Sequence, residues 1–256
     1  MKKKLGIIQT RGLGDIIIAL PIALHYHEQG YHVHWPIIEQ WTEQMNIAAP
    51  WVKWIPITPD QGPFFYDIPM QRLKNFGCDE IICLYQALTG HPDFTQRPEF
   101  QITGFDQIKY HIAKVPFKKK WTLNKCITRD YTRENNLLTQ LEIDIDKPYA
   151  VIHTQGSNYS TQIDKQWIPP EWRIIEITDL TNSVFDWLTI LENAHGIIVI
   201  DSVFANLIDQ LAISDTVDSY FLPRSHIQLT PVLGSAWTIL HPDEDTTKKI
   251  AIFHAN

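Results

Sequence analysis

Short apolar runs rich in β-branched residues alternate with helical patterns along the whole chain. The runs predicted as strands lie at residues 5–9, 31–35, 52–57, 80–85, 149–153, 196–200, 217–221 and 236–240, and 172–178 is predicted as a short helix-to-strand element. Helical patterns follow several of them, most clearly at 183–193 and 202–213. This alternation is typical of βαβ units, which build parallel sheets. We therefore expect an α/β protein.

The length of the chain allows two such sheets. Its 256 residues can form one large domain or two of ordinary size. A polar stretch around 142–148 separates two α/β halves, so we expect an N-terminal domain over 1–146 and a C-terminal domain over 147–256, whose last residues could pack back on the first domain. The segments 58–72 and 86–116 are predicted to be long loops that form walls of an acceptor pocket.

The composition excludes several classes of protein. A net charge of −7 argues against nucleic-acid binding that depends mainly on counterion release. The three cysteines show no CxxC pairing, which indicates a reducing compartment and offers no metal framework. The apolar N-terminal run is interrupted by Gln9, Arg11 and Asp15, so it is neither a signal peptide nor a membrane span. We expect a cytoplasmic, soluble protein without a membrane span.

The segment LGIIQTRGLGDIIIALP, residues 5–21, carries the first candidate site. An apolar strand enters a loop broken by Gly12 and Gly14, and the loop ends in Asp15 at the mouth of an apolar helix. The first N–H groups of a helix stabilise an anion there. Asp15 is either a helix N-cap, worth about 1 kcal/mol, or a general base at the rim of a cleft. Pro21 is predicted to kink the helix or end its first segment.

Three polar elements in the second half supply further candidates. A strand runs into T-Q-G-S at the edge where open α/β sheets bind ligands, a lysine precedes a tryptophan-rich segment, and an Asp-Ser pair starts a helix whose amides could cradle a phosphate. The residues are Thr154, Gln155, Gly156, Ser157, Lys165, Asp201 and Ser202. Alternatively, Lys165 is an ordinary surface lysine and the Asp-Ser pair only caps its helix.

Three motifs together resemble glycosyltransferase family 9, the heptosyltransferase-like group. RGLGDIIIALP resembles the family's S-x-G-D-x-x-x-A-L-P signature, and KQWIPPEW resembles its K-x-W-P-x-E-x-W element. Residues 188–211 resemble its L-x-x-A-x-x-V-V-x-x-D-[ST]-G-x-x-H-L-A-A-A-L block. The matches cover the start of the chain and most of 149–213, whereas 58–140 is much less diagnostic.

The resemblance implies the GT-B fold, in which two Rossmann-like domains face each other across a cleft. It implies a nucleoside-diphosphate sugar held mainly by the C-terminal domain, and transfer with inversion that needs neither a metal ion nor another cofactor. By position, Asp15 matches the family's proposed base, Lys165 its phosphate-binding lysine, and Asp201 with Ser202 its nucleotide-binding pair.

The chain also departs from the family pattern. Val203 and Asn206 stand where the family has Gly and His; Asn206 can still donate a hydrogen bond but carries no charge. The glycine-rich turn after the next strand is F-L-P-R-S here, so we expect Arg224 to contact the diphosphate. The segment between Trp172 and Asp179 is shorter than in the family and would lack part of the ribose site. The donor base and its sugar are therefore left open.

The expected reaction is displacement at the anomeric carbon. Asp15 would take the proton of an acceptor hydroxyl, and the leaving diphosphate would be stabilised by Lys165, the Ser202 helix terminus, residues 154–157 and Arg224. Arg11, Gly12 and Gly14 would bring the first loop close to the donor, because glycine adds no side-chain bulk.

Several functions stay open at this stage. The resemblance favours a saccharide acceptor of the lipopolysaccharide type. A hydroxymethylated base of phage DNA is an alternative, because the tract 110–121 mixes lysines with aromatic residues. A non-catalytic sugar-nucleotide binder is a third, and the G-L-G-D after the first strand would suit an NAD-dependent dehydrogenase, although the full G-x-G-x-x-G is missing.

Overall fold

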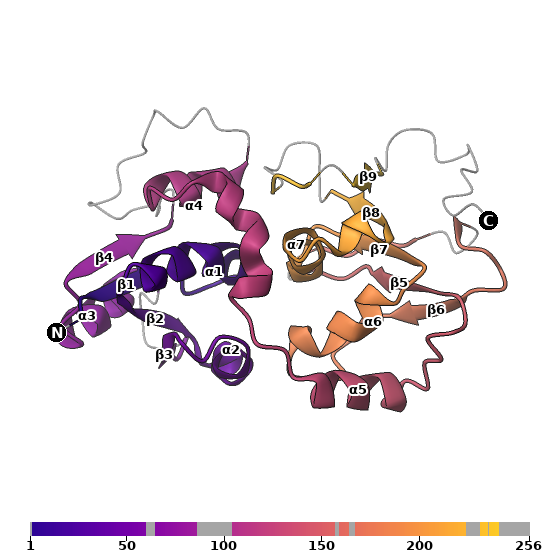
Figure 1. Cartoon of the computed structure of the whole chain (residues 1–256), viewed down its shortest axis with the longest axis horizontal. Coiled ribbons are helices and arrows are strands. Elements are labelled where there is room, and N and C mark those ends of the chain that lie inside the picture. The colour runs from indigo at the N-terminus through magenta and orange to yellow at the C-terminus, as the bar shows by residue number, and fades with distance from the viewer. Residues whose placement is uncertain are drawn as a thin grey trace. The chain divides into compact units, whose positions relative to one another are not determined.

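The computed structural model divides the chain into two compact units, Met1–Thr128 and Arg129–Asn256 (Figure 1). It describes residues 2–59, 65–85, 104–156, 159–163, 167–223, 231–234 and 236–240. Each unit is built around its own parallel sheet.

The N-terminal unit contains a four-stranded sheet in the order β3-β2-β1-β4, with every neighbouring pair parallel. Its strands are β1 Lys4–Ile8, β2 His32–Ile38, β3 Lys53–Ile57 and β4 Glu80–Cys83. Its helices are α1 Leu13–Glu28, α2 Thr42–Ala48, α3 Asp67–Asn75 and α4 Phe105–Ile112, with the 3-10 segments η1 Glu39–Trp41 and η2 Phe117–Lys125. The strands confirm the predicted positions within a few residues.

Helix α1 is the buried centre of this unit. Its residues from Ile16 to Ala23 are all buried, because the segment is apolar around its whole circumference. The helix runs through Pro21 to Glu28, so the prediction that Pro21 could end it is wrong. A proline removes one N–H bond from the helix, but packing on all sides of α1 supplies most of a buried helix's stability.

The C-terminal unit contains a five-stranded sheet in the order β6-β5-β7-β8-β9, again with parallel neighbours. Its strands are β5 Tyr149–His153, β6 Arg173–Glu176, β7 Gly196–Ile200, β8 Asp218–Leu222 and β9 Trp237–Ile239. Its helices are α5 Tyr131–Gln140, α6 Leu188–Glu192 and α7 Val203–Gln210, with the 3-10 segments η4 Val184–Trp187 and η5 Ile213–Asp215.

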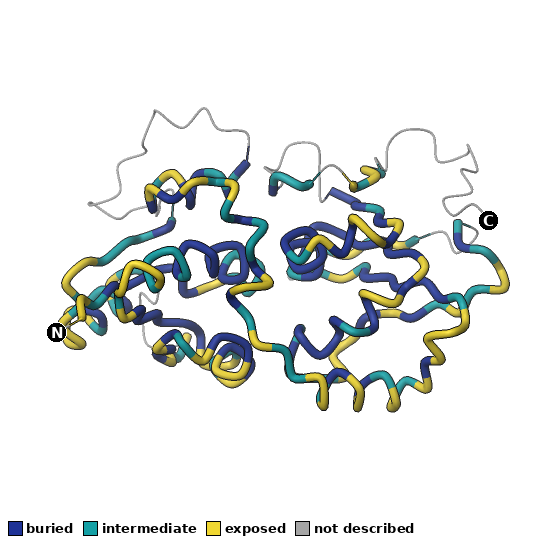
Figure 2. The backbone as a smooth tube through the Cα atoms, viewed as in Figure 1, coloured by how far each residue is buried: buried dark blue, intermediate teal, exposed yellow. Residues whose placement is uncertain are grey.

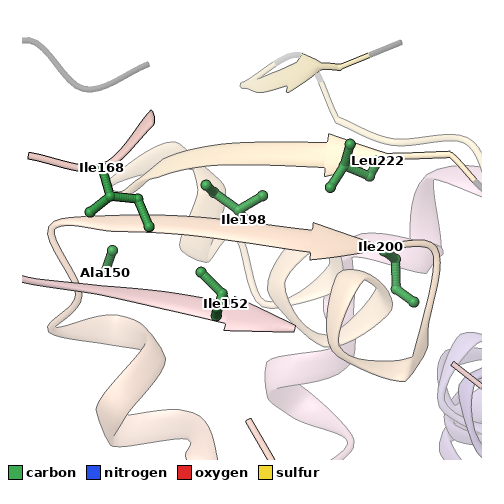
Figure 3. Close-up of a cluster of buried hydrophobic side chains, with 6 residues drawn as sticks. All are labelled: Ala150, Ile152, Ile168, Ile198, Ile200 and Leu222. Atoms are coloured by element: carbon green, nitrogen blue, oxygen red, sulfur yellow. The ribbon is translucent and has the colours of Figure 1, made fainter. Parts of the chain in front are cut away.

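The core of the C-terminal unit lies on the central strands. Every residue of β5 and β7 is buried, and α7 is dark blue over most of its length in Figure 2. One cluster of buried side chains, drawn in Figure 3, joins β5, β7 and β8 to a residue that precedes β6. Its members are Ala150, Ile152, Ile168, Ile198, Ile200 and Leu222. Because both faces of these strands are covered, their sequences are continuous apolar runs.

Helix α5 belongs to the C-terminal unit although it lies before residue 146. Its Glu134 is buried and pairs with Arg129. The same carboxylate accepts hydrogen bonds from the backbone amide and the hydroxyl of Thr189, at 3.0 and 2.6 Å. This network fixes α5 against the start of α6, so the units divide between Thr128 and Arg129.

Both segments predicted as long loops contain helical residues. Helix α3 begins at Asp67, inside 58–72, and α4 spans Phe105–Ile112, inside 86–116. The prediction of a loop is therefore wrong for the residues of 58–72 that belong to α3 and for the residues of 86–116 that belong to α4. The rest of both segments includes 60–64 and 86–103, which lie outside the described residues, so the acceptor-pocket walls stay a prediction.

Both sheets reverse their strand order at a central strand. In the N-terminal unit the chain goes from β1 outward to β2 and β3, then returns to β4 on the other side of β1. In the C-terminal unit it goes from β5 to β6, then returns to β7 on the other side of β5. Ligands of open α/β sheets bind outside the carboxyl ends of the strands at such switch points. Ligand sites are therefore expected at the ends of β1 and β4, and at the ends of β5 and β7.

Candidate functional site

Tyr85 closes the switch point of the N-terminal unit. It follows β4, and its phenol oxygen accepts hydrogen bonds from the backbone amides of Thr10 and Arg11, at 3.0 and 3.2 Å. It also shares a hydrogen bond of 3.1 Å with the Thr10 hydroxyl. Burial raises the pKa of Tyr85 above its usual range, so the phenol is neutral at pH 7. These contacts attach the loop after β1 to the end of β4.

The side chain of Arg11 lies over this closed loop. Its guanidinium carbon is 5.5 Å from the centre of the Phe65 ring, and Phe65 in turn packs edge-on against Tyr85. The residue itself is exposed. An exposed guanidinium ordered by an aromatic face is suited to an anionic group of a ligand.

Asp15 lies in the first turn of α1, and Gly12 rather than Asp15 occupies the N-cap position. The interpretation of Asp15 as the N-cap is therefore wrong. Its Oδ1 forms an ion pair of 3.0 Å with Nζ of Lys109, which comes from α4. The Lys109 side chain is only 7% exposed, whereas that of Asp15 is 35% exposed. The carboxylate thus has one side against the protein and one side open to solvent.

Gly12 makes room for this carboxylate. Its φ is +79°, and a Cβ added at Gly12 would lie 2.3 Å from Oδ2 of Asp15. The residue must therefore be glycine both for its backbone conformation and for its lack of a side chain. Gly14 lies two residues after Gly12, in the first turn of α1. Its proposed closeness to a donor stays a prediction.

His153 and Ser202 meet at the switch point of the C-terminal unit. His153 ends β5, and its Nδ1 shares a buried hydrogen bond of 3.0 Å with the hydroxyl of Ser202, which follows β7. The His153 ring also packs edge-on against Phe204 of α7. Burial lowers the pKa of His153 to about 4, against a weaker opposing effect of Asp179. His153 is therefore neutral at pH 7.

The Ser202 hydroxyl does not cap its own helix. Ser202 is the N-cap of α7, yet its side chain makes no hydrogen bond to the helix amides, because it is engaged by His153. The amides of the first turn of α7 therefore do not depend on Ser202 Oγ, an arrangement compatible with an anion at this helix end. Sequence reasoning missed His153; its place directly before T-Q-G-S was the signal available.

Asp201 and Asn206 are both buried beside Ser202. The Asp201 backbone amide donates to the carbonyl of Leu222, at 3.0 Å, which joins the ends of β7 and β8. The Asn206 side-chain amide donates to the Ser202 carbonyl, also at 3.0 Å. Its Oδ1 has no hydrogen-bond partner among the described residues. The side-chain N–H of Asn206 is thus used within the start of α7, and its Oδ1 is available for another contact.

The loop after β5 folds back on itself. The Gly156 amide donates to the Tyr159 carbonyl, at 2.7 Å, and the Thr154 hydroxyl donates to Glu176 Oε1, at 3.4 Å. Gln155 is exposed. Three of the predicted donor-binding residues, Ser157, Lys165 and Arg224, lie outside the described residues.

In the lysine-aromatic tract 110–121, buried residues are interspersed with exposed ones. Tyr110 is buried and donates its hydroxyl to the Ile18 carbonyl, at 2.9 Å. Lys120 is fully buried in an ion pair of 2.9 Å with Asp106. Neither Tyr110 nor Lys120 can therefore stack on or pair with a nucleic acid.

A separate pocket of about 360 Å³ lies in the C-terminal unit between α5 and residues 180–186. Arg133 at its edge forms a bidentate ion pair with Asp186, at 2.9 and 2.8 Å, so the two charges compensate each other. The pocket contains none of the predicted site residues.

Two further features concern the part of the chain that the structure describes. Its cysteines carry free thiols, and no three His, Cys, Asp or Glu side chains are grouped there as metal ligands would be. Among the described helices, none combines the length and apolar content needed to cross a bilayer.

Comparison with known proteins gives a match in fold. No protein-family model matches the chain, and no curated protein matches it. A glycosyltransferase family 9 structure from Veillonella parvula matches with a TM-score of 0.57 and 10% identity, over 93% of this chain and 87% of that one. The E. coli heptosyltransferase WaaC with ADP matches with a TM-score of 0.52 and 14% identity, over 93% of both chains.

A third structure, the E. coli ADP-heptose lps heptosyltransferase II, matches with a TM-score of 0.52 and 10% identity, over 93% of this chain and 90% of that one. The predicted fold class is confirmed: two Rossmann-like α/β units, each with a parallel sheet, as in the GT-B heptosyltransferases. The predicted likeness to glycosyltransferase family 9 is confirmed at the level of fold.

Proposed function

We propose that this chain is a glycosyltransferase that moves a sugar from a nucleoside-diphosphate sugar to a hydroxyl of a saccharide acceptor, with inversion and without a metal ion. The observation that carries the proposal is Asp15. It is a partly exposed carboxylate, ion-paired on one side, at the switch point of a fold shared with glycosyltransferase family 9 structures.

Asp15 would act as the general base. The acceptor hydroxyl gives its proton to the carboxylate while its oxygen forms the bond to the anomeric carbon. A positioned base of this kind contributes roughly 10²–10⁴-fold to the rate. Because a single displacement occurs at the anomeric carbon, the configuration there is inverted.

The C-terminal unit would hold the donor. The bond to the diphosphate breaks with its electron pair leaving on the diphosphate oxygen, and the added negative charge needs preorganised donors. The amides at the start of α7, the backbone of 154–157, Lys165 and Arg224 are the groups we assign to this task. Asp201 and Asn206 would contact the nucleotide, and Arg11, Gly12 and Gly14 would approach the donor from the N-terminal unit.

The similar structures suggest which substrates to try first. One of them is described with ADP and another as an ADP-heptose lps heptosyltransferase. We therefore propose an ADP-linked sugar as the first donor to test and a lipopolysaccharide-type glycan as the first acceptor.

The test is an Asp15→Asn variant. The amide keeps the size of the side chain but is not a base, so we expect the turnover number to fall at least 100-fold while the Kd for the donor stays within about twofold. Asp67→Asn is the matched control, because Asp67 is likewise an acidic residue in the first turn of a helix, α3, and turnover should be retained.

Two outcomes would contradict the proposal. Loss of donor binding in Asp15→Asn would make Asp15 a structural residue. A wild-type protein that binds the nucleotide sugar but neither transfers nor hydrolyses it would be a non-catalytic binder.

A further inference from the structure

We propose that Lys109 is a positioning residue that holds the carboxylate of Asp15 in its working orientation. This inference rests on the proposed function of Asp15 as the base. Lys109 belongs to α4, far along the chain from the loop after β1, and it lies outside the motifs that identify the candidate site.

Lys109 has two oxygen partners and little contact with solvent. Its Nζ lies 3.0 Å from Oδ1 of Asp15 and 2.7 Å from Oε1 of Gln9. It also lies 5.8 Å from the centre of the Phe105 ring. The side chain is 7% exposed, and a buried ammonium is costly unless it is paired and hydrogen-bonded. The position of the ammonium is therefore fixed by its surroundings.

Gln9 fixes the other end of this chain of contacts. It is buried, and its Nε2 donates to the backbone carbonyl of Arg11, at 2.8 Å. With its amide nitrogen directed to Arg11, its oxygen is the atom directed to Lys109. Lys109 therefore contacts the loop from 9 to 15 at both of its ends, through Gln9 and through Asp15. These two contacts connect α4 to the loop.

The protein side of the Asp15 carboxylate is held as a result, while the side chain stays 35% exposed. Lys109 engages Oδ1, and Oδ2 lies so close to Gly12 that a Cβ there would be 2.3 Å away. A carboxylate in this setting cannot rotate freely about its side-chain bonds. A base must lie within about 2.6–3.2 Å of the proton it takes, and an error of about 1 Å can cost 10²-fold in rate.

The ion pair also fits the course of the proton. The acceptor proton moves to Asp15, the O–H electron pair forms the new C–O bond, and the diphosphate leaves with the electron pair of the old one. Lys109 then keeps Gln9 as a partner but faces a neutral acid. Release of the proton from Asp15 to water restores the ion pair, so the base is ready for the next turnover.

The experiment compares Lys109→Met with Lys119→Met in the full chain. Lys119 is a matched control because it pairs with Glu28 at 3.7 Å in the same unit and is partly exposed. For Lys109→Met we expect the turnover number to fall about 10²-fold, with donor Kd within twofold. Lys109→Arg, which keeps the charge, should recover part of the loss, and Lys119→Met should match the wild type.

A structural readout separates this inference from the proposed function. Crystal structures of Lys109→Met and Lys119→Met should show the Asp15 carboxylate displaced only in the first. If the carboxylate is unmoved in Lys109→Met, the inference is overturned whatever the activity. If the wild type transfers no sugar but the carboxylate moves, the proposed function fails and the positioning role stands.

Two further variants guard against ambiguous results. If Lys109→Met does not fold, Gln9→Met removes the second partner of the ammonium, and a loss of turnover with unchanged donor Kd is expected. On an Asp15→Asn background, Lys109→Met should change the residual rate less than twofold, because two residues that act through one another are not additive. An independent, full additional loss would overturn the inference.

Discussion

At the residue scale, Gly12 decides where the candidate base can lie. We expect Gly12→Ala to destabilise the protein by about 1–3 kcal/mol, since it combines a positive φ with a contact of 2.3 Å to the Asp15 carboxylate. It should also lower the turnover number by displacing that carboxylate. Denaturant unfolding and steady-state kinetics would measure the two effects.

The matched control for this substitution is Gly77→Ala. Gly77 also has a positive φ, +67°, but a Cβ there meets nothing within 4 Å. The control therefore carries the backbone cost alone, and its turnover should be that of the wild type. Equal kinetic effects in the two variants would show that the Asp15 contact is not what matters.

His153 gives a second residue-scale prediction, on pH. Burial lowers its pKa to about 4 from an ordinary value near 6.5. Between these values the unfolded chain takes up a proton that the folded protein does not. The stability is therefore complete above pH 6.5 and falls, by up to about 3 kcal/mol, as the pH drops to 4.

The comparison for this effect is His153→Gln, which does not titrate and can still hydrogen-bond to Ser202. We expect the free energy of unfolding of the wild type to fall more steeply than that of the variant from pH 6.5 to 4. Parallel curves over this range would show that His153 titrates normally in the folded state.

The local position of single residues was predicted where a motif marked it, whereas their roles stay predictions. Asp15, Asp201 and Ser202 stand at a strand-to-helix junction, and the strand and helix patterns on either side located them. Lys109 could not be found in this way, because its link to Asp15 is a tertiary contact between α1 and α4. In the sequence, Lys109 stands only as a lysine within the predicted loop 86–116.

At the element scale, α4 is fixed in place by a buried ion pair. Asp106 of α4 and Lys120 of η2 are fully buried, at 2.9 Å from each other. We expect Lys120→Met to destabilise the protein by about 3–5 kcal/mol, because it leaves a charged carboxylate without its ammonium in the interior. Thermal or denaturant unfolding would measure this.

Two companions make the result interpretable. Lys120→Met combined with Asp106→Asn removes both charges and should recover a large part of the lost stability. Lys119→Met, at a partly exposed pair, should cost less than about 1 kcal/mol. A Lys120→Met variant as stable as Lys119→Met would mean that the buried pair does not anchor α4.

The strands were predicted closely and some helices were not, for one physical reason. Strands buried on both faces must be continuous apolar runs, so their limits are visible, as in Tyr149–His153 and Gly196–Ile200. Helix α4 includes a buried ion pair, and its sequence FDQIKYHI therefore looks more polar than its position in the unit. Tertiary pairing, which the sequence does not display, makes such a helix part of the core.

At the scale of the whole molecule, likeness in fold persists without likeness in sequence. The solved structures match over 93% of the chain at 10–14% identity. A parallel sheet requires continuous apolar strands, and many different apolar side chains can fill the same core. The motifs at the switch points are short, which is why they were visible in the sequence while the remainder of the chain gave little guidance.

Because the chain has two units, thermal unfolding can show which unit binds a nucleotide. Each has its own buried sheet, so each should unfold as a separate cooperative body, and two calorimetric transitions are expected. Ile7 in β1 and Ile198 in β7 are both fully buried. Ile7→Ala and Ile198→Ala should each lower the free energy of unfolding of one unit by about 2–5 kcal/mol, and with it the temperature of one transition. These variants assign the transitions to the units.

A nucleoside diphosphate should then shift only one of the two. If the C-terminal unit holds the donor, ADP at about 100 times its Kd stabilises that unit by about 2.7 kcal/mol. In the wild type with ADP, the midpoint temperature of the transition assigned by Ile198→Ala should rise. The midpoint of the transition assigned by Ile7→Ala should be unchanged within error. Because binding to one body stabilises only that body, a rise confined to the transition marked by Ile7→Ala would place the nucleotide on the N-terminal unit and reverse our assignment of the donor.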